Sequence, residues 1–475
     1  MVIKFGTDGW RAIIDQDFND RNVAMLAQAV ANYLINLKME RRGVAIGYDT
    51  RRKSKHFAKI VAEVFAGNDI PVMFTEDYTP TPALAYTVLK HKLAGAVMIT
   101  ASHNPPEWNG FKFIPYHTGP ALPEETSAIE SEISKVYGKK VRRMDFEKAI
   151  SRGLITLYSP KEDYAHWVLS FLDLNLLKNK RLKVIVDPMH GASCGYLDYI
   201  LSQIGCEIEV IHGTPDPLFG GLTPEPIEKN LHALSEHVVL RGADIGLATD
   251  GDADRVGVCD VNGVFISPNQ LYPLLYLHLI EFKNMKGNVA RTVSTTHLVD
   301  RIAEHYGYQS IETPVGFKYI GKLLREGKAI IGGEESGGFS IVNHVSEKDG
   351  ILTALLAAEI KAELNFSLTS RLNQIHERYG FMISGRVDVR CEKGREVVEL
   401  IKRSSISKVA GLEVSKVIDI DGIKFVLRNG SWLLLRASGT EPLLRIYAES
   451  NSREKLEELL GFGKKLAEET SLKLA

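Results

Sequence analysis

The chain has 475 residues, of which 44% are hydrophobic and 25% charged, so it can bury a sizeable core and is not a disordered protein. At roughly 100–200 residues per domain, this length suggests three or four domains. Lys and Arg number 58 against 59 Asp and Glu, for a net charge of −1. Non-specific nucleic-acid binding needs a basic excess, so we expect no nucleic-acid partner.

The cysteines and the apolar stretches bear on where in the cell the protein is expected to work. The four cysteines contain no CxxC pair, which fits neither a disulfide scaffold nor a zinc site. Asp8 interrupts the N-terminus before any apolar signal-peptide core forms. The most apolar runs, such as 271–280, fall far short of the ~20 residues that span a bilayer. We therefore expect a soluble, cytoplasmic protein with no membrane partner.

Short apolar runs alternate with helical patterns along most of the chain, which is typical of α/β architecture. Ligands of open α/β sheets bind beyond the carboxyl ends of strands, so the polar loops after these runs are where we expect chemistry. The recurrence of the pattern suggests similar α/β units in tandem. Five such runs end in polar segments: Val44–Gly47, Leu93–Thr100, Lys183–Asp187, Ala243–Thr249 and Ala329–Ile331.

The last hundred residues differ from the rest. Ile423–Leu427 and Ser431–Leu435 flank an Arg-Asn-Gly turn and predict a β-hairpin. A strand at Leu444–Ala448 precedes a helix from about residue 452, with Asn451 and Glu454 as a capping box. We expect a smaller, mainly antiparallel α+β domain here. The predicted domains are 1–158, 159–262, 263–375 and 376–475.

The segment Asp250-Gly251-Asp252-Ala253-Asp254-Arg255 directly follows a predicted strand. Three carboxylates at alternate positions can turn their oxygens to one side, as a hard divalent cation requires. The alternative is an acidic surface turn. An EF-hand loop is excluded because Arg255 stands where its invariant Gly belongs and Val261 where its bidentate Glu belongs.

Ser102 lies in the segment Thr100-Ala101-Ser102-His103-Asn104-Pro105, beyond another predicted strand. A serine in such a loop is a possible nucleophile, but no G-x-S-x-G elbow surrounds it. We expect His103 to point away from Ser102 in most local conformations. On its own, this segment is more typical of a capped turn than of a site.

Two further loops carry polar groups suited to a sugar phosphate. In 332–338, two carboxylates and a hydroxyl flanked by glycines suit sugar hydroxyls, although a flexible acidic loop explains them equally well. In 436–442, an arginine, hydroxyls and a glycine, followed by Arg445, suit a phosphate dianion. The alternative there is a structural turn after the hairpin.

Taken together and in this order, the loops resemble those of one family, the α-D-phosphohexomutases (phosphoglucomutases and phosphomannomutases). The segment 5–11 (FGTDGWR) is similar to the family's N-terminal motif, and Ser102 falls on its phosphoserine. Residues 250–255 fall on its magnesium loop, 333–338 on its sugar loop and 436–442 on its phosphate loop. The resemblance covers the whole chain.

The resemblance implies four domains around a central active-site cleft, three of them similar α/β mixed-sheet units and the fourth α+β. It implies an enzyme that interconverts hexose 1- and 6-phosphates, most readily of glucose, through a phosphoserine and a 1,6-bisphosphate. The substrate is then a small sugar phosphate, the cofactor Mg²⁺ and the activator glucose 1,6-bisphosphate, and the protein is a monomer or homodimer. The implied metal ligands are Ser102, Asp250, Asp252 and Asp254.

The resemblance also assigns the remaining site residues. Candidates for acid–base work and charge stabilisation beside Ser102 are Arg11, His103, Lys112 and Lys348, the last resembling a lysine of the glucose-specific branch. The implied substrate-binding residues are Arg255, Gly316, Glu334, Ser336, Arg436, Ser438, Gly439, Thr440 and Arg445.

One departure bears on the substrate. Members that accept both mannose and glucose phosphates often end the sugar loop with His, whereas position 338 is Gly, which favours glucose. The alternatives are a phosphomannomutase or phosphoglucosamine mutase, a non-catalytic sugar-phosphate-binding protein on the same fold, and a hydrolase or bisphosphate synthase.

Overall fold

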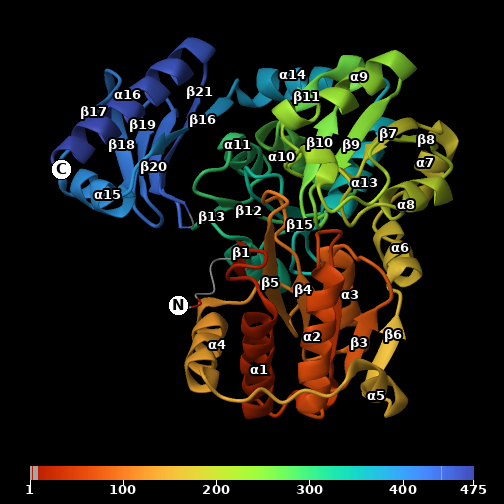
Figure 1. The fold of residues 1–475 in the computed structure, drawn as a ribbon. Helices are drawn as coiled ribbons and strands as arrows, with labels where there is room; N and C mark the ends of the chain where they lie inside the picture. Colours follow the sequence, from red (N-terminus) through yellow and green to blue (C-terminus); the bar gives the residue numbers. More distant parts are fainter. Residues whose placement is uncertain (1–2, 4–8, 440, 475) are drawn as a thin grey trace.

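The computed structural model describes residues 3, 9–439 and 441–474, and within them the strands form four sheets. Figure 1 shows the N-terminal unit at the bottom and the C-terminal unit at the upper left, with the yellow-to-teal part of the chain between and beside them. We call these the first to fourth units, comprising the elements β1 to β6, α6 to β11, α10 to α14 and β16 to α16. No helix in the described residues is long and apolar enough to cross a membrane.

The first unit has a six-stranded mixed sheet in the order β1-β5-β4-β2-β3-β6. Strands β2, β3, β4 and β6 run parallel, and β5 is antiparallel to both of its neighbours. No residue of β2 or β4 is exposed, as expected for parallel strands covered on both faces. The strands are β1 (Trp10–Ile13), β2 (Val44–Tyr48), β3 (Val72–Thr75), β4 (Gly95–Ile99), β5 (Trp108–Pro115) and β6 (Ile155–Tyr158). The helices are α1 (Asp20–Asn36), α2 (Ser54–Gly67), α3 (Thr81–His91), α4 (Pro123–Val136) and α5 (Phe146–Ser151).

The second unit repeats this design with a five-stranded sheet in the order β11-β10-β9-β7-β8. Strands β8, β7 and β9 are parallel, whereas β10 and β11 are antiparallel additions at one edge. The strands are β7 (Lys183–Asp187), β8 (Glu207–Val210), β9 (Ile245–Thr249), β10 (Val256–Cys259) and β11 (Phe265–Ile266). The helices are α6 (Lys161–Leu169), α7 (Leu174–Lys180), α8 (Leu197–Gln203) and α9 (His232–Arg241).

The third unit has a four-stranded sheet in the order β13-β12-β14-β15, again parallel except for its last strand. The strands are β12 (Val289–Thr292), β13 (Ser310–Thr313), β14 (Ile331–Gly333) and β15 (Phe339–Ile341). The helices are α10 (Pro268–Leu277), continued by a π-helical turn (His278–Phe282), α11 (Leu298–His305), α12 (Phe317–Arg325), α13 (Gly350–Glu363) and α14 (Leu368–Tyr379).

The fourth unit is wholly antiparallel, with six strands in the order β16-β21-β20-β19-β18-β17 and two helices. The strands are β16 (Ile383–Arg390), β17 (Lys408–Val409), β18 (Leu412–Ile418), β19 (Ile423–Leu427), β20 (Trp432–Ala437) and β21 (Leu443–Ser450). The helices are α15 (Gly394–Arg403) and α16 (Arg453–Leu472). Short 3₁₀ turns elsewhere in the chain occupy Glu40–Arg42, Phe219–Gly221, Glu228–Asn230 and Val261–Gly263.

Helix α13 joins the second and third units into one core. No residue from 350 to 358 is charged, and every residue from 350 to 362 is buried, as expected for a helix with apolar side chains on all faces. It lies against β9 and β10 of the second unit and β15 of the third, so apolar side chains of both units form a single cluster. At its first residue, Gly350 N donates to Ala253 O at 3.0 Å, and a Cβ on Gly350 would lie 2.3 Å from Arg255 O. Helix α13 therefore begins in direct backbone contact with the acidic loop of residues 250–255.

The structure confirms the α/β class of the first three units and the antiparallel class of the fourth. The strands predicted at Lys183–Asp187 and Ile423–Leu427 are β7 and β19. The run Ala329–Ile331 was placed too early, because Gly332 and Gly333 belong to strand β14 and not to the loop.

The predicted capping box of α16 is also wrong, because Ser452 is the N-cap and its side chain accepts from Lys455 N. The domain boundaries near 158, 262 and 375 stay predictions. Strand β11, at Phe265–Ile266, pairs with β10 and so extends the second sheet beyond residue 262.

Candidate active site

Ser102 lies in the loop that follows β4 and is buried, with its backbone in the left-handed region at φ 50°. Its Oγ donates a hydrogen bond to Asp250 Oδ2 at 2.8 Å, so a hydroxyl of the first unit meets a carboxylate of the second. His103 Nδ1 lies 3.3 Å from the same Oγ. The expectation that His103 points away from Ser102 is therefore wrong. The Ser102 hydroxyl therefore contacts both the carboxylate of Asp250 and the imidazole of His103.

The backbone of Ser102 is anchored by residues that follow strand β2. Thr100 Oγ1 accepts from Ser102 N at 2.8 Å and donates to Asp49 Oδ2 at 2.6 Å, and Arg51 Nη2 donates to Ser102 O at 2.6 Å. In the sequence, residues 48–51 are recognisable only as the polar end of a strand, and no role was predicted for Asp49 or Arg51. The available signal was an acid and an arginine two residues apart at the carboxyl end of a buried strand.

The three aspartates of residues 250–255 converge in the turn between β9 and β10. All three are buried, and each offers a carboxylate oxygen within 4.8 Å of the other two. Asp252 Oδ1 and Asp254 Oδ1 are buried without a hydrogen-bond partner among the described residues. Burial, with Asp254 and Asp252 close by, raises the pKa of Asp250 well above its usual range. Buried carboxylate oxygens left over in this way fit a divalent cation.

Two buried lysines contact the same acids. Lys112 Nζ, on β5, lies 3.2 Å from Asp252 Oδ2 and 3.0 Å from Asp254 Oδ2. Lys348 Nζ, just before α13, lies 3.1 Å from Asp254 Oδ2. Burial opposes ionisation of Asp254, but Lys348 and Lys112 outweigh it and lower the pKa of that carboxyl. The structure thus brings both predicted lysines to the predicted acidic loop.

The predicted sugar loop follows β14. Glu334 Oε1 accepts from Gly316 N at 3.0 Å, which joins two predicted sugar-contact positions. Burial raises the pKa of Glu334 to about 7. The charge of Lys348 opposes this shift, and the charge of Glu335 adds to it. Ser336 is half-buried at the turn. Glu335, the second of the two carboxylates predicted to suit sugar hydroxyls, accepts from Ser294 Oγ at 2.7 Å.

The predicted phosphate loop joins β20 to β21. Arg436 Nε donates to Asp421 Oδ2 at 2.7 Å, and the same oxygen accepts from Val315 N, next to Gly316 of the third unit, at 3.0 Å. Ser438 Oγ accepts from Glu441 N at 3.3 Å, and Arg445 Nη2 donates to Glu441 Oε2 at 2.8 Å. Gly439 is exposed, and Thr440 lies outside the described residues.

The remaining predicted residues lie around His103. Arg11 Nη1 donates to Asn104 Oδ1 at 2.7 Å, whereas residues 5–8 of the N-terminal motif lie outside the described residues. Arg255 lies 3.7 Å from Glu225 and 3.9 Å from Asp254. Burial lowers the pKa of His103 well below its usual value, and the charges of four nearby arginines lower it further. These arginines are Arg255, Arg11, Arg51 and Arg445.

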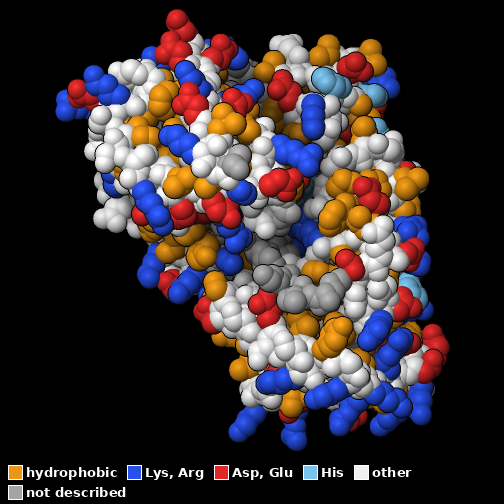
Figure 2. Space-filling view, turned by 60° about the vertical axis from the view of Figure 1, so that its left-hand side comes forward, with side chains coloured by type: hydrophobic (Ala, Val, Ile, Leu, Met, Phe, Trp, Pro, Cys, Tyr) orange, Lys and Arg blue, Asp and Glu red, His pale blue; other side chains and the backbone are white. Residues whose placement is uncertain are grey.

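The fourth unit therefore contributes positive charge, from Arg445, to the surroundings of Ser102. Figure 2 shows this face of the molecule hollowed between its upper and lower parts, with Lys and Arg side chains at the rim of the hollow.

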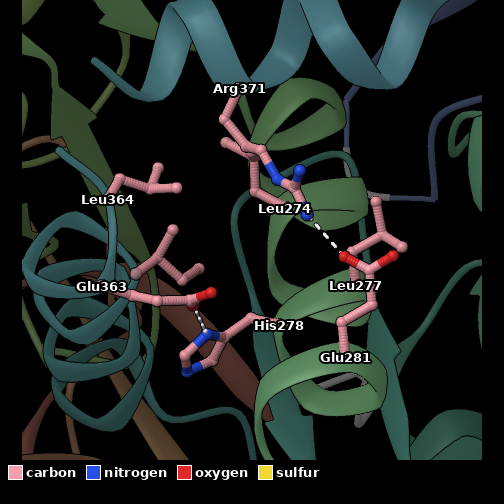
Figure 3. Close-up of a pocket in the computed structure, with 8 residues that line it drawn as sticks. Leu274, Leu277, His278, Glu281, Glu363, Leu364 and Arg371 are labelled. Atoms are coloured by element: carbon pink, nitrogen blue, oxygen red, sulfur yellow. Dashed lines mark hydrogen bonds and ion pairs between the residues drawn. The ribbon is translucent and has the colours of Figure 1, made fainter. Parts of the chain in front are cut away.

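A small cavity elsewhere in the protein contains none of these residues. It lies between α10, α13 and α14, where Glu363 faces His278 and Arg371 faces Glu281 (Figure 3). Both nitrogens of His278 contact carboxylates, at 2.7 Å to Glu359 and 2.9 Å to Glu363. The cavity has a volume of about 10 Å³ and holds at most one water molecule. We therefore assign it a structural role.

Comparison with known families matches four successive segments of the chain. Residues 2–139, 162–263 and 267–379 match the phosphoglucomutase/phosphomannomutase alpha/beta/alpha domains I, II and III. Residues 387–461 match the phosphoglucomutase/phosphomannomutase C-terminal domain. The segments follow the order in which the serine, acidic, sugar and phosphate loops occur.

Individual relatives are similar over nearly their whole length. A phosphoglucomutase/phosphomannomutase of Thermococcus kodakarensis is 32% identical over 98% of both chains. A phosphoglucosamine/phosphogalactosamine mutase of Sulfurisphaera tokodaii is 30% identical over 98% of this chain and 99% of its own. A solved structure described as a putative phosphomannomutase from Thermus thermophilus superposes with a TM-score of 0.86 at 33% identity, over 98% of this chain and 99% of that one. The relatives thus agree on a type of reaction and differ in the sugar.

Proposed function

The chain belongs to the phosphoglucomutase/phosphomannomutase family of α-D-phosphohexomutases, and we propose that it interconverts glucose 1-phosphate and glucose 6-phosphate. In this proposal Ser102 carries a phosphoryl group, and a glucose 1,6-bisphosphate forms between the two half-reactions. The observation that carries it is the 2.8 Å hydrogen bond from Ser102 Oγ to Asp250 Oδ2, beside two further buried aspartates. This contact sets a nucleophile beside a cation site, the arrangement on which phosphoryl transfer depends.

The acidic loop fits Mg²⁺. Asp250, Asp252 and Asp254 are hard oxygen ligands, and two of their buried oxygens have no hydrogen-bond partner among the described residues. These three residues, with Ser102, would hold the cation, which when bound supplies Lewis-acid stabilisation of charge on the phosphoryl oxygens. Lys112 and Lys348 contact the same carboxylates and add fixed positive charge there.

The proposed transfer conserves atoms and charge. The P–O bond to Ser102 Oγ breaks, a P–O bond forms to the free hydroxyl of the hexose phosphate, and one proton passes in net from that hydroxyl to Ser102 Oγ. The position of His103 Nδ1, 3.3 Å from Oγ, supports His103 as the group that returns this proton. The bisphosphate then turns over, and its other phosphoryl group returns to Ser102 by the reverse of the same step.

The other loops are suited to a sugar that must bind in two orientations. Glu334 and Ser336 offer a carboxylate and a hydroxyl to the ring hydroxyls, and Gly316 lies within hydrogen-bond distance of Glu334. Arg436, Ser438, Gly439, Thr440 and Arg445 would bind the phosphate that does not react, with Arg11 and Arg255 adding positive charge nearby. Such guanidinium groups bind phosphate in bidentate fashion.

The preference for glucose rests on position 338. A Cβ there would lie 2.4 Å from Lys348 Cδ, so only glycine leaves room for Lys348 where it lies. A His at this position, which members of mixed specificity often carry, would displace Lys348 from where it lies. Because relatives of about 30% identity carry names for different sugars, mannose and glucosamine phosphates are the alternative substrates.

The test is a coupled assay of glucose 6-phosphate formation from glucose 1-phosphate, with Mg²⁺ and catalytic glucose 1,6-bisphosphate. Mannose 1-phosphate and glucosamine 1-phosphate are assayed alongside. Ser102→Ala should abolish turnover, and exposed Ser134→Ala is the matched control. Turnover of another sugar alone would replace the glucose assignment, and turnover that persists in Ser102→Ala would remove the phosphoserine mechanism.

A further inference from the structure

The buried guanidinium of Arg51 is hydrogen-bonded to backbone carbonyls of the loop that contains Ser102, which we call the serine loop. The side chain of Arg51 follows β2, and the residue is 3% exposed. Its two terminal nitrogens donate to four backbone oxygens, three in the loop after β4 and one on the first residue of β5: Ser102 O (2.6 Å), Asn104 O (2.5 Å), Pro105 O (2.7 Å) and Trp108 O (3.1 Å). One planar side chain therefore fixes the course of the loop on both sides of His103.

Asp49 completes the anchor. It accepts Arg51 Nε at 3.1 Å, which directs the guanidinium toward the loop and balances its charge. It also accepts Thr100 Oγ1, which in turn accepts Ser102 N. Both the carbonyl and the amide of Ser102 are thus connected to the Asp49–Arg51 pair. A buried pair with every donor direction used is rigid, and removal of one partner leaves the other charge uncompensated.

The backbone of Ser102 requires such an anchor. Its φ of 50° is a left-handed conformation that a non-glycine residue adopts at a cost of roughly 1 kcal/mol. Strain of this kind persists only where neighbouring contacts over-determine it. In this conformation Oγ points to Asp250 Oδ2, so the contacts that hold the backbone also set the direction of the hydroxyl.

Arg51 also touches the second unit. Its guanidinium carbon lies 4.8 Å from the centre of the Phe219 ring, which is buried in the segment between β8 and α9. The Arg51–Phe219 contact therefore also joins the first and second units, close to where the serine loop meets the acidic loop.

From these contacts we infer that Arg51 is a positioning residue for phosphoryl transfer, which holds Ser102 Oγ against the acidic loop through the backbone of residues 102–108. The inference deepens the proposed mutase function and rests on it. Lysine cannot replace Arg51, because an ammonium group has three donors and no planar fork. A misplacement of about 1 Å at a reacting centre lowers a rate by about a hundredfold.

The test compares Arg51→Lys with Arg52→Lys in steady-state assays on the sugar phosphate that wild type turns over. Arg52 is the matched control because its exposed side chain pairs only with Asp15 at the surface among the contacts described. We expect Arg51→Lys to lower kcat by about a hundredfold and to change KM by less than about threefold, since Arg51 acts through Ser102. Arg52→Lys should match wild type.

Two further experiments distinguish a loss of positioning from misfolding of the variant protein. Thr100→Val keeps Arg51 and the side-chain shape but removes the hydroxyl link to Ser102 N, and it should also lower kcat at constant KM. Millimolar guanidinium ion should restore part of the activity of Arg51→Ala. Wild-type kcat in Arg51→Lys, or a change confined to KM, overturns the inference alone. A wild-type protein with no turnover on any hexose phosphate overturns the proposed function, and this inference with it.

Discussion

The stem of Lys348 lies directly over Gly338. A Cβ on residue 338 would come within 2.4 Å of Lys348 Cδ and 3.0 Å of its Cγ. Lys348 Nζ in turn lies 3.1 Å from Asp254 Oδ2. The last position of the sugar loop is therefore linked to the acidic loop through one side chain, and a change at residue 338 reaches both.

Gly338→Ala tests this link. The added methyl group displaces Lys348 and removes its contact with Asp254, so we expect kcat/KM for glucose 1-phosphate to fall by about tenfold, as for the loss of one charged contact in a buried site. Gly461→Ala, where a Cβ would meet no atom within 4 Å, is the control. That control should keep full activity and gain up to about 1 kcal/mol from helix propensity. Equal activity of the two variants would disprove the link.

Asp252→Asn tests the acidic loop as a cation site. Three buried carboxylates within 4.8 Å of one another repel when ionised, and a bound cation relieves that repulsion. We expect Mg²⁺ to raise the melting temperature of wild type and to have little effect on Asp252→Asn. The variant should lose activity by about a hundredfold or more. Exposed Asp419→Asn is the matched control, and an equal Mg²⁺ shift in all three proteins would exclude the site.

Glu334→Gln tests the buried acid of the sugar loop. The pKa of Glu334 is raised from 4.5 to about 7, so the folded protein binds this proton more tightly than the unfolded chain. Stability from this group is therefore complete at low pH and is lost as the pH rises from 4.5 through 7, by up to about 3 kcal/mol. Urea unfolding at pH 5 and pH 7.5 should show a smaller pH-dependent loss in Glu334→Gln than in wild type or in exposed Glu304→Gln. An identical pH dependence in all three would contradict the prediction.

Lys424→Met tests the joint between the third and fourth units. Lys424 is fully buried on β19, and its Nζ contacts Val293 O at 2.7 Å, His297 Nε2 at 2.7 Å and Glu312 Oε1 at 2.9 Å. Its removal takes this donor from Val293 O and His297 Nε2, while Glu312 Oε1 keeps Arg291 Nη1 at 2.7 Å, so we expect a loss of about 3 kcal/mol in the free energy of unfolding. Lys464→Met, on the exposed face of α16, should lose less than about 1 kcal/mol. Chemical denaturation of both variants measures the difference, and similar losses in the two would refute the role of Lys424.

The fold class could be predicted from the sequence because it depends on local patterns. Buried strands such as Lys183–Asp187 are apolar runs that end in polar residues, and a β-hairpin such as β19–β20 carries its turn in the sequence. Errors arose where a local pattern had two interpretations. Gly332 and Gly333 indicate a loop, yet they pair with β12 and β15 as part of strand β14, and Ile320 and Phe339 pack where their side chains would be.

The site could be predicted only as far as each loop carries its own chemistry. Ser102 and the three aspartates stand in recognisable segments, and the structure brings them into contact. Asp49, Arg51 and Asp421 were missed because their roles arise from partners distant in the sequence, as Ser102 lies 51 positions after Arg51. No local periodicity records such pairs. Propensity describes neighbours along the chain, whereas positioning depends on neighbours in space.

Asp421 gives the phosphate loop an internal competitor. Its carboxylate accepts Arg436 Nε and Val315 N, so the arginine proposed to bind phosphate is already engaged with an anion that belongs to the protein. A ligand that recruits this guanidinium fully must exchange with Asp421, which favours a doubly charged phosphate over a neutral sugar or a singly charged anion. The hydrogen bond from Val315 N to Asp421, beside the sugar loop, does not depend on Arg436. Because Val315 belongs to the third unit and Asp421 to the fourth, the carboxylate that competes with the ligand for Arg436 also joins the two units.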